Sequence, residues 1–253
     1  MRQFGLLGKS LGHSFSRKYF TQKFQDEGIE SEYHLHELTD ISELPALLKQ
    51  YPNIRGLNVT IPYKTAVLPY MDDLSDEARS VGAVNTIRVE QDRLTGHNSD
   101  VVGFKRSLEE FLADAVPAQA LILGTGGAAK AVEYVLLHYM KIPFRFVSRT
   151  PAQDQFGYDE LTNIDMNDWP LIINTTPLGM YPNTDHAPTL PYAKLEQRHF
   201  VYDLIYNPAE TKLMTLAKAQ GVSVCNGLQM LILQAERSWE IWNEIDESGE
   251  ETV

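Results

Sequence analysis

The chain alternates short apolar runs with longer segments in which apolar residues recur at helical spacing. Residues 4–8, 54–60 and 118–123 are apolar runs of strand length, and the last is apolar enough to be covered on both faces. Tyr19, Phe20 and Phe24 have the spacing of one helix face. Strands separated by helices predict an α/β fold with a mostly parallel sheet.

The second half of the chain repeats this alternation as a unit of its own. The strands expected there are residues 118–123, 144–147, 171–173, 200–202 and 222–225, and the helices are residues 101–113, 127–139, 211–220 and 228–242. Before it, residues 84–89 and 94–97 flank a polar turn and predict a hairpin. We therefore expect a domain boundary near residue 100.

Composition excludes several classes of protein. The 253 residues carry a net charge of −12, and no basic stripe suited to nucleic acid occurs. Cys225 is the single cysteine, so neither an intrachain disulfide nor a cysteine-based metal site is expected. No apolar stretch reaches the roughly 18–20 residues of a membrane span. We expect a cytoplasmic protein without a metal site or a membrane partner.

A strand that ends in polar side chains is the most informative segment. The run from Ile54 leads to Asn58, Thr60 and Lys64, and Pro62 stiffens the turn between them. Polar groups on a rigid corner suit a site for a hydroxylated small molecule. Two Gly-led segments, residues 82–86 and 96–100, present further amides, hydroxyls and a carboxylate.

A glycine-rich turn follows the strand at residues 118–123. Residues 124–129 fit the pattern G-x-G-x-x-[GA] between a strand and a helix. Gly124 allows the tight turn, Gly126 allows close approach of a pyrophosphate, and Ala129 allows helix–strand packing. The turn predicts dinucleotide binding.

The end of the next strand indicates which dinucleotide. An NAD enzyme usually carries Asp or Glu there, whereas this chain has Ser148, Arg149 and Thr150. A guanidinium and hydroxyls suit a 2′-phosphate, so we predict NADP.

Taken together, these segments resemble the shikimate dehydrogenase (shikimate/quinate dehydrogenase) family over almost the whole chain. The blocks that carry the resemblance are residues 13–16 (HSFS), 58–64 (NVTIPYK), 82–86 (GAVNT), 96–100 (GHNSD), 124–128 (GTGGA), 148–150 (SRT), 174–180 (NTTPLGM), 203–208 (DLIYNP) and 227–235 (GLQMLILQA).

The resemblance implies a two-domain fold and a reaction. A substrate-binding domain would comprise residues 1–100 plus 228–253, a Rossmann-like NADP-binding domain would comprise residues 101–227, and a cleft would lie between them. The implied reaction is the reversible, NADP-dependent reduction of 3-dehydroshikimate to shikimate, a step toward chorismate and the aromatic amino acids. Shikimate and 3-dehydroshikimate would be the small-molecule partners, and the protein would be a monomer or a homodimer.

The resemblance also assigns roles to residues. It implies that Lys64 and Asp100 are catalytic. The substrate-binding residues that it implies are Ser14, Ser16, Thr60, Lys64, Asn85, Asp100, Tyr206 and Gln234. The cofactor-binding residues are Gly124, Thr125, Gly126, Gly127, Ala128, Ser148, Arg149, Thr150, Thr175, Leu204 and Gly227. His13 is left out of the catalytic set.

The chemistry of the reaction agrees with these roles. Hydride addition to a ketone develops negative charge on oxygen, and an ammonium beside that oxygen stabilises it and can donate the proton. Lys64 would supply the ammonium, and Asp100 would orient it and accept a ring hydroxyl bond. Which of the two makes the formal proton transfer stays open.

Two departures and two alternatives complete the prediction. Arg17 stands where the family commonly has proline, and Gln153 stands where many members have a second cation for the 2′-phosphate. One alternative is a quinate or dual quinate/shikimate dehydrogenase that uses NAD or NADP. The other is a non-catalytic, ligand-sensing regulator, which would not need Lys64 and Asp100.

Overall fold

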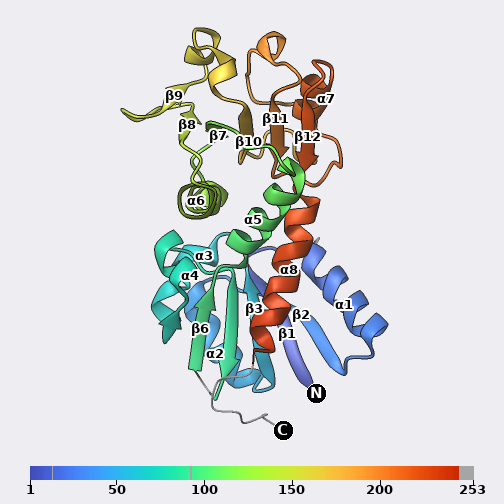
Figure 1. The fold of residues 1–253 in the computed structure, drawn as a ribbon. Coiled ribbons are helices and arrows are strands. Elements are labelled where there is room, and N and C mark those ends of the chain that lie inside the picture. The colour runs from blue at the N-terminus through green and yellow to red at the C-terminus, as the bar shows by residue number, and fades with distance from the viewer. Residues whose placement is uncertain (13, 92, 245–253) are drawn as a thin grey trace. The chain divides into compact units, whose positions relative to one another are not determined.

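The computed structural model describes residues 1–12, 14–91 and 93–244, and the chain divides into two compact units (Figure 1). Unit 1 holds the chain up to Ser99 together with the segment from Ala235 onward, and unit 2 holds Asp100–Gln234. The resemblance implies that residues 228–253 all belong to the first domain. The structure instead divides the last helix, with residues 228–234 in unit 2.

Unit 1 is built around a six-stranded sheet. Its strands are β1 (Arg2–Gly8), β2 (Ser31–Glu37), β3 (Ile54–Val59), β4 (Asp73–Leu74), β5 (Thr86–Glu90) and β6 (Arg93–His97). Its helices are α1 (Phe15–Glu27), α2 (Leu44–Gln50), α3 (Tyr63–Ala66), α4 (Asp76–Val81), the 3₁₀ helices η1 (Ile41–Glu43) and η2 (Leu68–Tyr70), and the second half of α8 (Leu228–Trp242).

The strand order in unit 1 is β2-β1-β3-β5-β6-β4, and β5 alone runs antiparallel to its neighbours. This confirms the mostly parallel sheet. It also confirms the hairpin expected between residues 84 and 97, which forms as β5 and β6.

Alternation along the strands gives unit 1 two apolar layers. Leu7, Leu57 and Ile87 face the core that contains α2, while Phe4 and Leu6 face α1 and the second half of α8. On the latter face the Trp242 indole lies against Gly56, where a Cβ would come within 2.3 Å of the ring. Gly56 is required here because the last helix packs directly on the strand.

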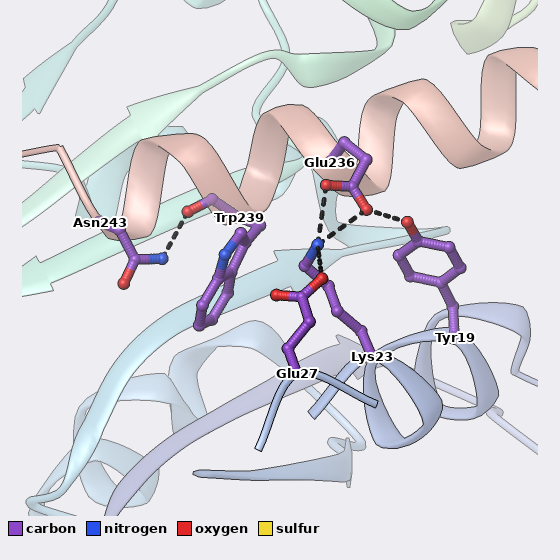
Figure 2. A network of polar contacts seen from close by, with 6 residues as sticks. All are labelled: Tyr19, Lys23, Glu27, Glu236, Trp239 and Asn243. Carbon is purple, nitrogen blue, oxygen red and sulfur yellow. Dashed lines mark hydrogen bonds and ion pairs between the residues drawn. The ribbon is translucent and has the colours of Figure 1, made fainter. Parts of the chain in front are cut away.

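A polar cluster also fastens α1 to α8 (Figure 2). Lys23 Nζ lies 2.8 Å from Glu27 Oε1 and 3.0 Å from Glu236 Oε2, and the Tyr19 hydroxyl donates to the Glu236 carboxylate. The Lys23 side chain is only 12% exposed, so these contacts are less screened than an open surface pair. They hold the middle and the C-terminal turn of α1 in place.

Unit 2 is a doubly wound unit with an all-parallel sheet. Its strands are β7 (Ala120–Leu123), β8 (Phe144–Ser148), β9 (Phe156–Gly157), β10 (Leu171–Asn174), β11 (Phe200–Asp203) and β12 (Ser223–Asn226). Its helices are α5 (Ser99–Leu112, of which Ser99 belongs to unit 1), α6 (Gly127–Tyr134), the π-helix η3 (Val135–Met140), the 3₁₀ helices η4 (Glu160–Thr162), η5 (Met166–Asp168) and η6 (Tyr192–Lys194), α7 (Lys212–Lys218) and the first half of α8.

The strand order in unit 2 is β12-β11-β10-β7-β8-β9. Numbered from β7 along the chain, this is 3-2-1-4-5-6, the order of Rossmann dinucleotide-binding sheets. Helices cover both faces: α5 packs on Tyr202, whose ring centroid lies 5.3 Å from that of Phe104, and Leu213 of α7 packs in the cluster with Val201. The order reverses between β7 and β10, the point at which such sheets bind ligands.

The described helices include none that is both long enough and apolar enough to span a lipid bilayer.

Candidate active site

In unit 1, the corner that follows β3 holds Thr60 and Lys64. Thr60 N donates to Leu7 O at 2.9 Å, and Tyr63 N donates to Thr60 O at 2.9 Å. The buried Tyr63 hydroxyl donates to Leu38 O at 2.7 Å, and the carbonyl of Lys64 accepts from Val84 N at 2.7 Å. The backbone that carries half-buried Lys64 is thus held from several sides, as a preorganised polar site requires.

Asn85 lies beside this corner and is almost completely buried, at 3% exposure. Its backbone joins β3 and β6, since Val59 N donates to Asn85 O at 2.8 Å and Asn85 N donates to His97 O at 3.0 Å. Its side-chain Oδ1 accepts from Ser99 N at 2.7 Å, and its Nδ2 donates to Ser99 Oγ at 3.0 Å. Ser99, the first residue of α5, is therefore held by Asn85, and Asp100 follows it in the chain.

Ser14 and Ser16, two of the predicted substrate-binding residues, lie at the start of α1. Ser14 is its N-cap, and Ser14 Oγ accepts from Arg17 N at 3.2 Å. This uses a lone pair and leaves the hydroxyl proton available to a ligand. Ser16 forms a side-chain hydrogen bond with the Tyr33 hydroxyl, whose pKa burial raises. His13 lies outside the described residues.

In unit 2, the glycine-rich turn follows β7 as the sequence predicts. Gly124 has φ +95°, and a Cβ on it would lie 2.9 Å from Thr176 Cγ2 and 3.1 Å from Thr175 Oγ1. Within the described part of the chain, a Cβ on Gly126 or Gly127 would meet nothing within 4 Å. Because Gly126 and Gly127 have no side chains, space remains open beside the turn.

The same turn exposes the start of α6. Gly126 is the N-cap and has no side chain to cap the helix. Ala129 N donates to Gly126 O at 3.1 Å, which leaves the amides of Gly127 and Ala128 at the start of α6 for a ligand. Thr125 and Ala128 are exposed beside it, whereas Ala129 is buried against the sheet. Free amides, the helix dipole and a gap at the glycines fit the pyrophosphate of a dinucleotide.

Next to the turn, the end of β8 presents Arg149. Thr150 N donates to Ser148 Oγ at 3.3 Å, and Ser148 Oγ donates to Thr150 O at 3.2 Å, which makes a tight local turn. Arg149 is exposed at its tip, and the described residues provide no carboxylate partner for it. Its positive charge opposes the rise that burial causes in the pKa of Tyr158, so the guanidinium lies near that hydroxyl. These residues suit a 2′-phosphate.

Thr175 connects the end of β10 to the glycine-rich turn after β7, at the point where the strand order of the sheet reverses. Thr175 N donates to Leu123 O at 3.0 Å, and Thr175 Oγ1 donates to the same oxygen at 2.7 Å. The end of β10 is therefore tied to the end of β7, directly beside Gly124. Strand order brings these two segments together although about 50 residues separate them in sequence.

The end of β11 carries Leu204 and Tyr206. Leu204 N donates to Asn174 O at 3.0 Å, and a Cβ on Gly227 would overlap Leu204 O at 2.0 Å. Leu204 and Gly227, both predicted to bind the cofactor, therefore lie in direct contact, and no side chain is possible at residue 227. Tyr206 is 39% exposed in the same loop.

Gln234 lies on the first half of α8 and is 8% exposed. Its Nε2 donates to Leu231 O of its own helix at 2.9 Å. A Cβ on Gly103 would come within 2.9 Å of Gln234 Cβ, so α5 and α8 cross closely at this residue.

The sequence analysis named several other residues within its blocks but gave them no role. Asp203 is fully buried and accepts from Asn174 Nδ2, Ile205 N and Thr211 Oγ1 at 2.9, 3.1 and 2.6 Å. Burial raises its pKa, although these hydrogen bonds oppose the rise. The clue in the sequence is a polar residue at the end of an apolar strand, followed by the turn signal Asn207-Pro208.

Comparisons with known proteins identify the family of the chain. Residues 6–87 match the family described as the shikimate dehydrogenase substrate binding domain. The chain is 40% identical to the shikimate dehydrogenase (NADP⁺) of Clostridium beijerinckii, over 96% of this chain and 93% of that protein.

Solved structures show the same similarity. A crystal structure of a shikimate dehydrogenase in complex with NADP⁺ matches with a TM-score of 0.84 and 32% identity, over 96% of this chain and 90% of that one. The Thermus thermophilus enzyme in complex with NADP(H) and shikimate matches with a TM-score of 0.82 and 31% identity, over 97% and 94% of the two chains.

Proposed function

Since the chain belongs to the shikimate dehydrogenase family, we infer that it is an NADP-dependent oxidoreductase that reversibly reduces 3-dehydroshikimate to shikimate. The observation that carries this function is the match of nearly the whole chain to enzymes of that name, combined with the dinucleotide-type turn between β7 and α6 of unit 2. The quinate alternative is not favoured by these relatives. The ligand-sensing regulator does not explain why Lys64 and Asp100 are both present.

NADPH, when bound, supplies the hydride for the ketone carbon. Residues Gly124–Ala128 would hold the pyrophosphate, and Ser148, Arg149 and Thr150 would hold the adenosine end with its 2′-phosphate. Thr175, Leu204 and Gly227 would line the nicotinamide end. The open space at Gly126 and Gly127 and the exposed Arg149 support this assignment.

On the substrate side, Ser14, Ser16 and Tyr206 would hold the carboxylate. The Ser14 hydroxyl keeps its proton for a ligand while it caps α1, which supports a donor role. Thr60, Asn85 and Gln234 would contact the ring oxygens.

Lys64 and Asp100 are proposed as the catalytic residues. As the hydride adds to carbon, negative charge develops on the ketone oxygen, and the Lys64 ammonium would stabilise it. The oxygen then takes up a proton, so a donor must lie within hydrogen-bond reach. The firmly held backbone of Lys64 and the anchored residue before Asp100 support their use as fixed groups.

One assay tests the function. Purified protein is mixed with shikimate and NADP, and the absorbance of the reduced nicotinamide is followed. Parallel reactions replace shikimate by quinate, or NADP by NAD. Rapid reduction only with shikimate and NADP supports the proposal. A faster reaction with quinate would support the dual-substrate alternative, and no reaction with shikimate would contradict the proposed function. The cytoplasmic location and the monomeric or homodimeric state remain predictions.

A further inference from the structure

Unit 1 contains a chain of buried hydrogen-bonding side chains on the sheet face that α1 and α8 cover. We call it the buried amide–hydroxyl network, and its members are Tyr33, Asn58, Asn85, Thr86, Ser99 and Ser238. Each member is at most 6% exposed. Burying this many polar groups is costly unless their hydrogen bonds are made, so the network holds its side chains in defined orientations.

At one end, Tyr33 orients Asn58. The Tyr33 hydroxyl donates to Asn58 Oδ1 at 2.7 Å, and Asn58 Nδ2 donates to Ser238 Oγ at 2.9 Å. Asn58 Nδ2 also donates to the backbone carbonyl of Asn85 at 3.5 Å, and because a carbonyl oxygen can only accept, this side of the amide carries the nitrogen. Tyr33 also contacts Ser16, one of the proposed carboxylate ligands.

In the middle, three hydroxyls form a triangle. The oxygens of Thr86, Ser99 and Ser238 lie 2.8 to 3.1 Å from one another. Ser238 comes from α8, whereas Thr86 and Ser99 lie on β5 and at the start of α5. The triangle therefore connects Asn58 to the segment that surrounds Asn85.

At the other end, Asn85 is held in one orientation. Its Oδ1 accepts from Ser99 N at 2.7 Å and from Thr86 Oγ1 at 3.2 Å. A backbone N–H can only donate, so the oxygen must be the atom that faces it. One hydrogen of Nδ2 goes to Ser99 Oγ at 3.0 Å, and the second has no acceptor in the described part of the chain.

We propose that Tyr33 and Ser238 are positioning residues: through Asn58 and the hydroxyl triangle they hold the Asn85 amide so that it offers an N–H donor to an oxygen of the substrate ring. The proposal rests on the proposed function, because it deepens the role of Asn85 in shikimate binding. It also specifies that Asn85 acts as a hydrogen-bond donor to the substrate. A site of this kind prefers a ring oxygen with a free lone pair and discriminates against an analogue that lacks that oxygen.

Steady-state kinetics of Tyr33→Phe and Ser238→Ala tests the proposal. Each variant removes one hydroxyl and keeps the rest of the side chain. We expect the KM for shikimate to rise about three- to tenfold, the size of one neutral hydrogen bond. The KM for NADP should stay unchanged, because no member of the network belongs to unit 2.

Matched controls come from a second buried pair. Ser107 Oγ and the Tyr202 hydroxyl lie 2.7 Å apart in unit 2, and both side chains are buried. Tyr202→Phe and Ser107→Ala make the same chemical deletions as the test variants. They should lower stability by a similar amount and leave the KM for shikimate unchanged.

Inhibition by substrate analogues separates positioning from a purely structural role. Analogues of shikimate that each lack one non-reacting ring hydroxyl are tested as inhibitors of the wild type and of Ser238→Ala. If the network orients Asn85 toward a ring oxygen, the analogue that lacks this oxygen should bind the wild type and Ser238→Ala almost equally. The other analogues should bind Ser238→Ala about three- to tenfold more weakly than the wild type.

Two results would overturn the proposal. One is an equal loss for shikimate and every analogue, and the other is a kinetic effect no larger than that of the Tyr202→Phe and Ser107→Ala controls. A wild-type protein that does not oxidise shikimate at all would instead show that the proposed function fails, so the two failures are distinct.

Discussion

The carboxylate of Asp203 accepts a 2.9 Å hydrogen bond from the Asn174 amide, and both side chains are fully buried at the ends of neighbouring strands. Asn174 Oδ1 in turn accepts from Thr176 N at 3.0 Å, and Asp203 accepts from Ile205 N at 3.1 Å. The pair therefore shapes both loops that leave this edge of the sheet, including the residues next to Thr175 and Leu204.

Replacing Asp203 by alanine should destabilise the protein strongly. The change leaves buried donors from Asn174, Ile205 and Thr211 without their acceptor, and we expect a loss of roughly 2–5 kcal/mol in the free energy of unfolding. Urea unfolding measures it. Asp154→Ala removes an exposed carboxylate from the same unit and should change stability by no more than about 0.5 kcal/mol. Similar stabilities for the two variants would contradict a structural role for Asp203.

Lys64→Ala should lower turnover much more than it weakens shikimate binding. The ammonium makes its largest interaction as charge develops on the ketone oxygen, so kcat should fall roughly 10²–10⁴-fold. Lys49→Ala, at an exposed position on α2, is the control and should retain normal kinetics. Near-normal kcat in Lys64→Ala would exclude the proposed catalytic role.

Ser14 allows capping to be separated from ligand binding. Ser14→Asp keeps an acceptor for Arg17 N, so α1 should remain capped and thermal stability should stay close to that of the wild type. The same change removes a donor and sets a carboxylate against the substrate carboxylate, so shikimate affinity should fall more than about tenfold. An analogue without the carboxylate should be almost unaffected. Equal losses for both ligands would mean that the loop only supports the fold.

The 2′-phosphate preference should depend on Arg149. Arg149→Ala should raise the KM for NADP and leave that for NAD almost unchanged, because NAD has no phosphate for the guanidinium to bind. Gln153→Arg should strengthen NADP binding, more so at low salt, since exposed charges are screened. Steady-state kinetics with both cofactors measures these effects. A loss of both cofactors to the same degree in Arg149→Ala would contradict this assignment.

Stability should decrease in mild acid because of His36. This side chain is 7% exposed, and its Nε2 has no hydrogen-bond partner among the described residues. Burial lowers its pKa, and the nearby His34 lowers it further. The unfolded chain therefore takes up a proton more readily than the folded one, and stability should fall as the pH drops below about 6.5, by at most roughly 1.4 kcal/mol per pH unit for this group.

His36→Leu should flatten that dependence when urea unfolding is repeated across the range from about pH 5 to 8. His186→Leu, at an exposed position in unit 2, should leave it unchanged. An unaltered pH dependence in His36→Leu would show that other groups cause it. Half-buried His97, whose pKa burial also lowers, is the next candidate.

Sequence patterns were sufficient to predict the features that depend on residues close together in the sequence. The apolar runs at residues 54–60 and 118–123 became β3 and β7, and the hairpin formed as β5 and β6. The glycine-rich turn could be recognised because its conformation requires particular residues at fixed offsets: Gly124 has φ +95°, and Gly126 leaves open space above α6. The helix expected at residues 127–139 was found, but its last turn is the π-helix Val135–Met140, which apolar spacing does not distinguish from an α-helix.

Only the tertiary structure determined which distant polar groups meet. Asn58 bonds to Ser238 across 180 residues of sequence, and a serine on a helix carries no local sign of such a partner. The same holds for Asp203, whose partners come from β10 and the start of α7. Local propensity sets where strands and helices form, whereas strand order and helix packing choose the partners of buried polar groups. Those groups must find partners somewhere, because leaving them unpaired away from water is costly.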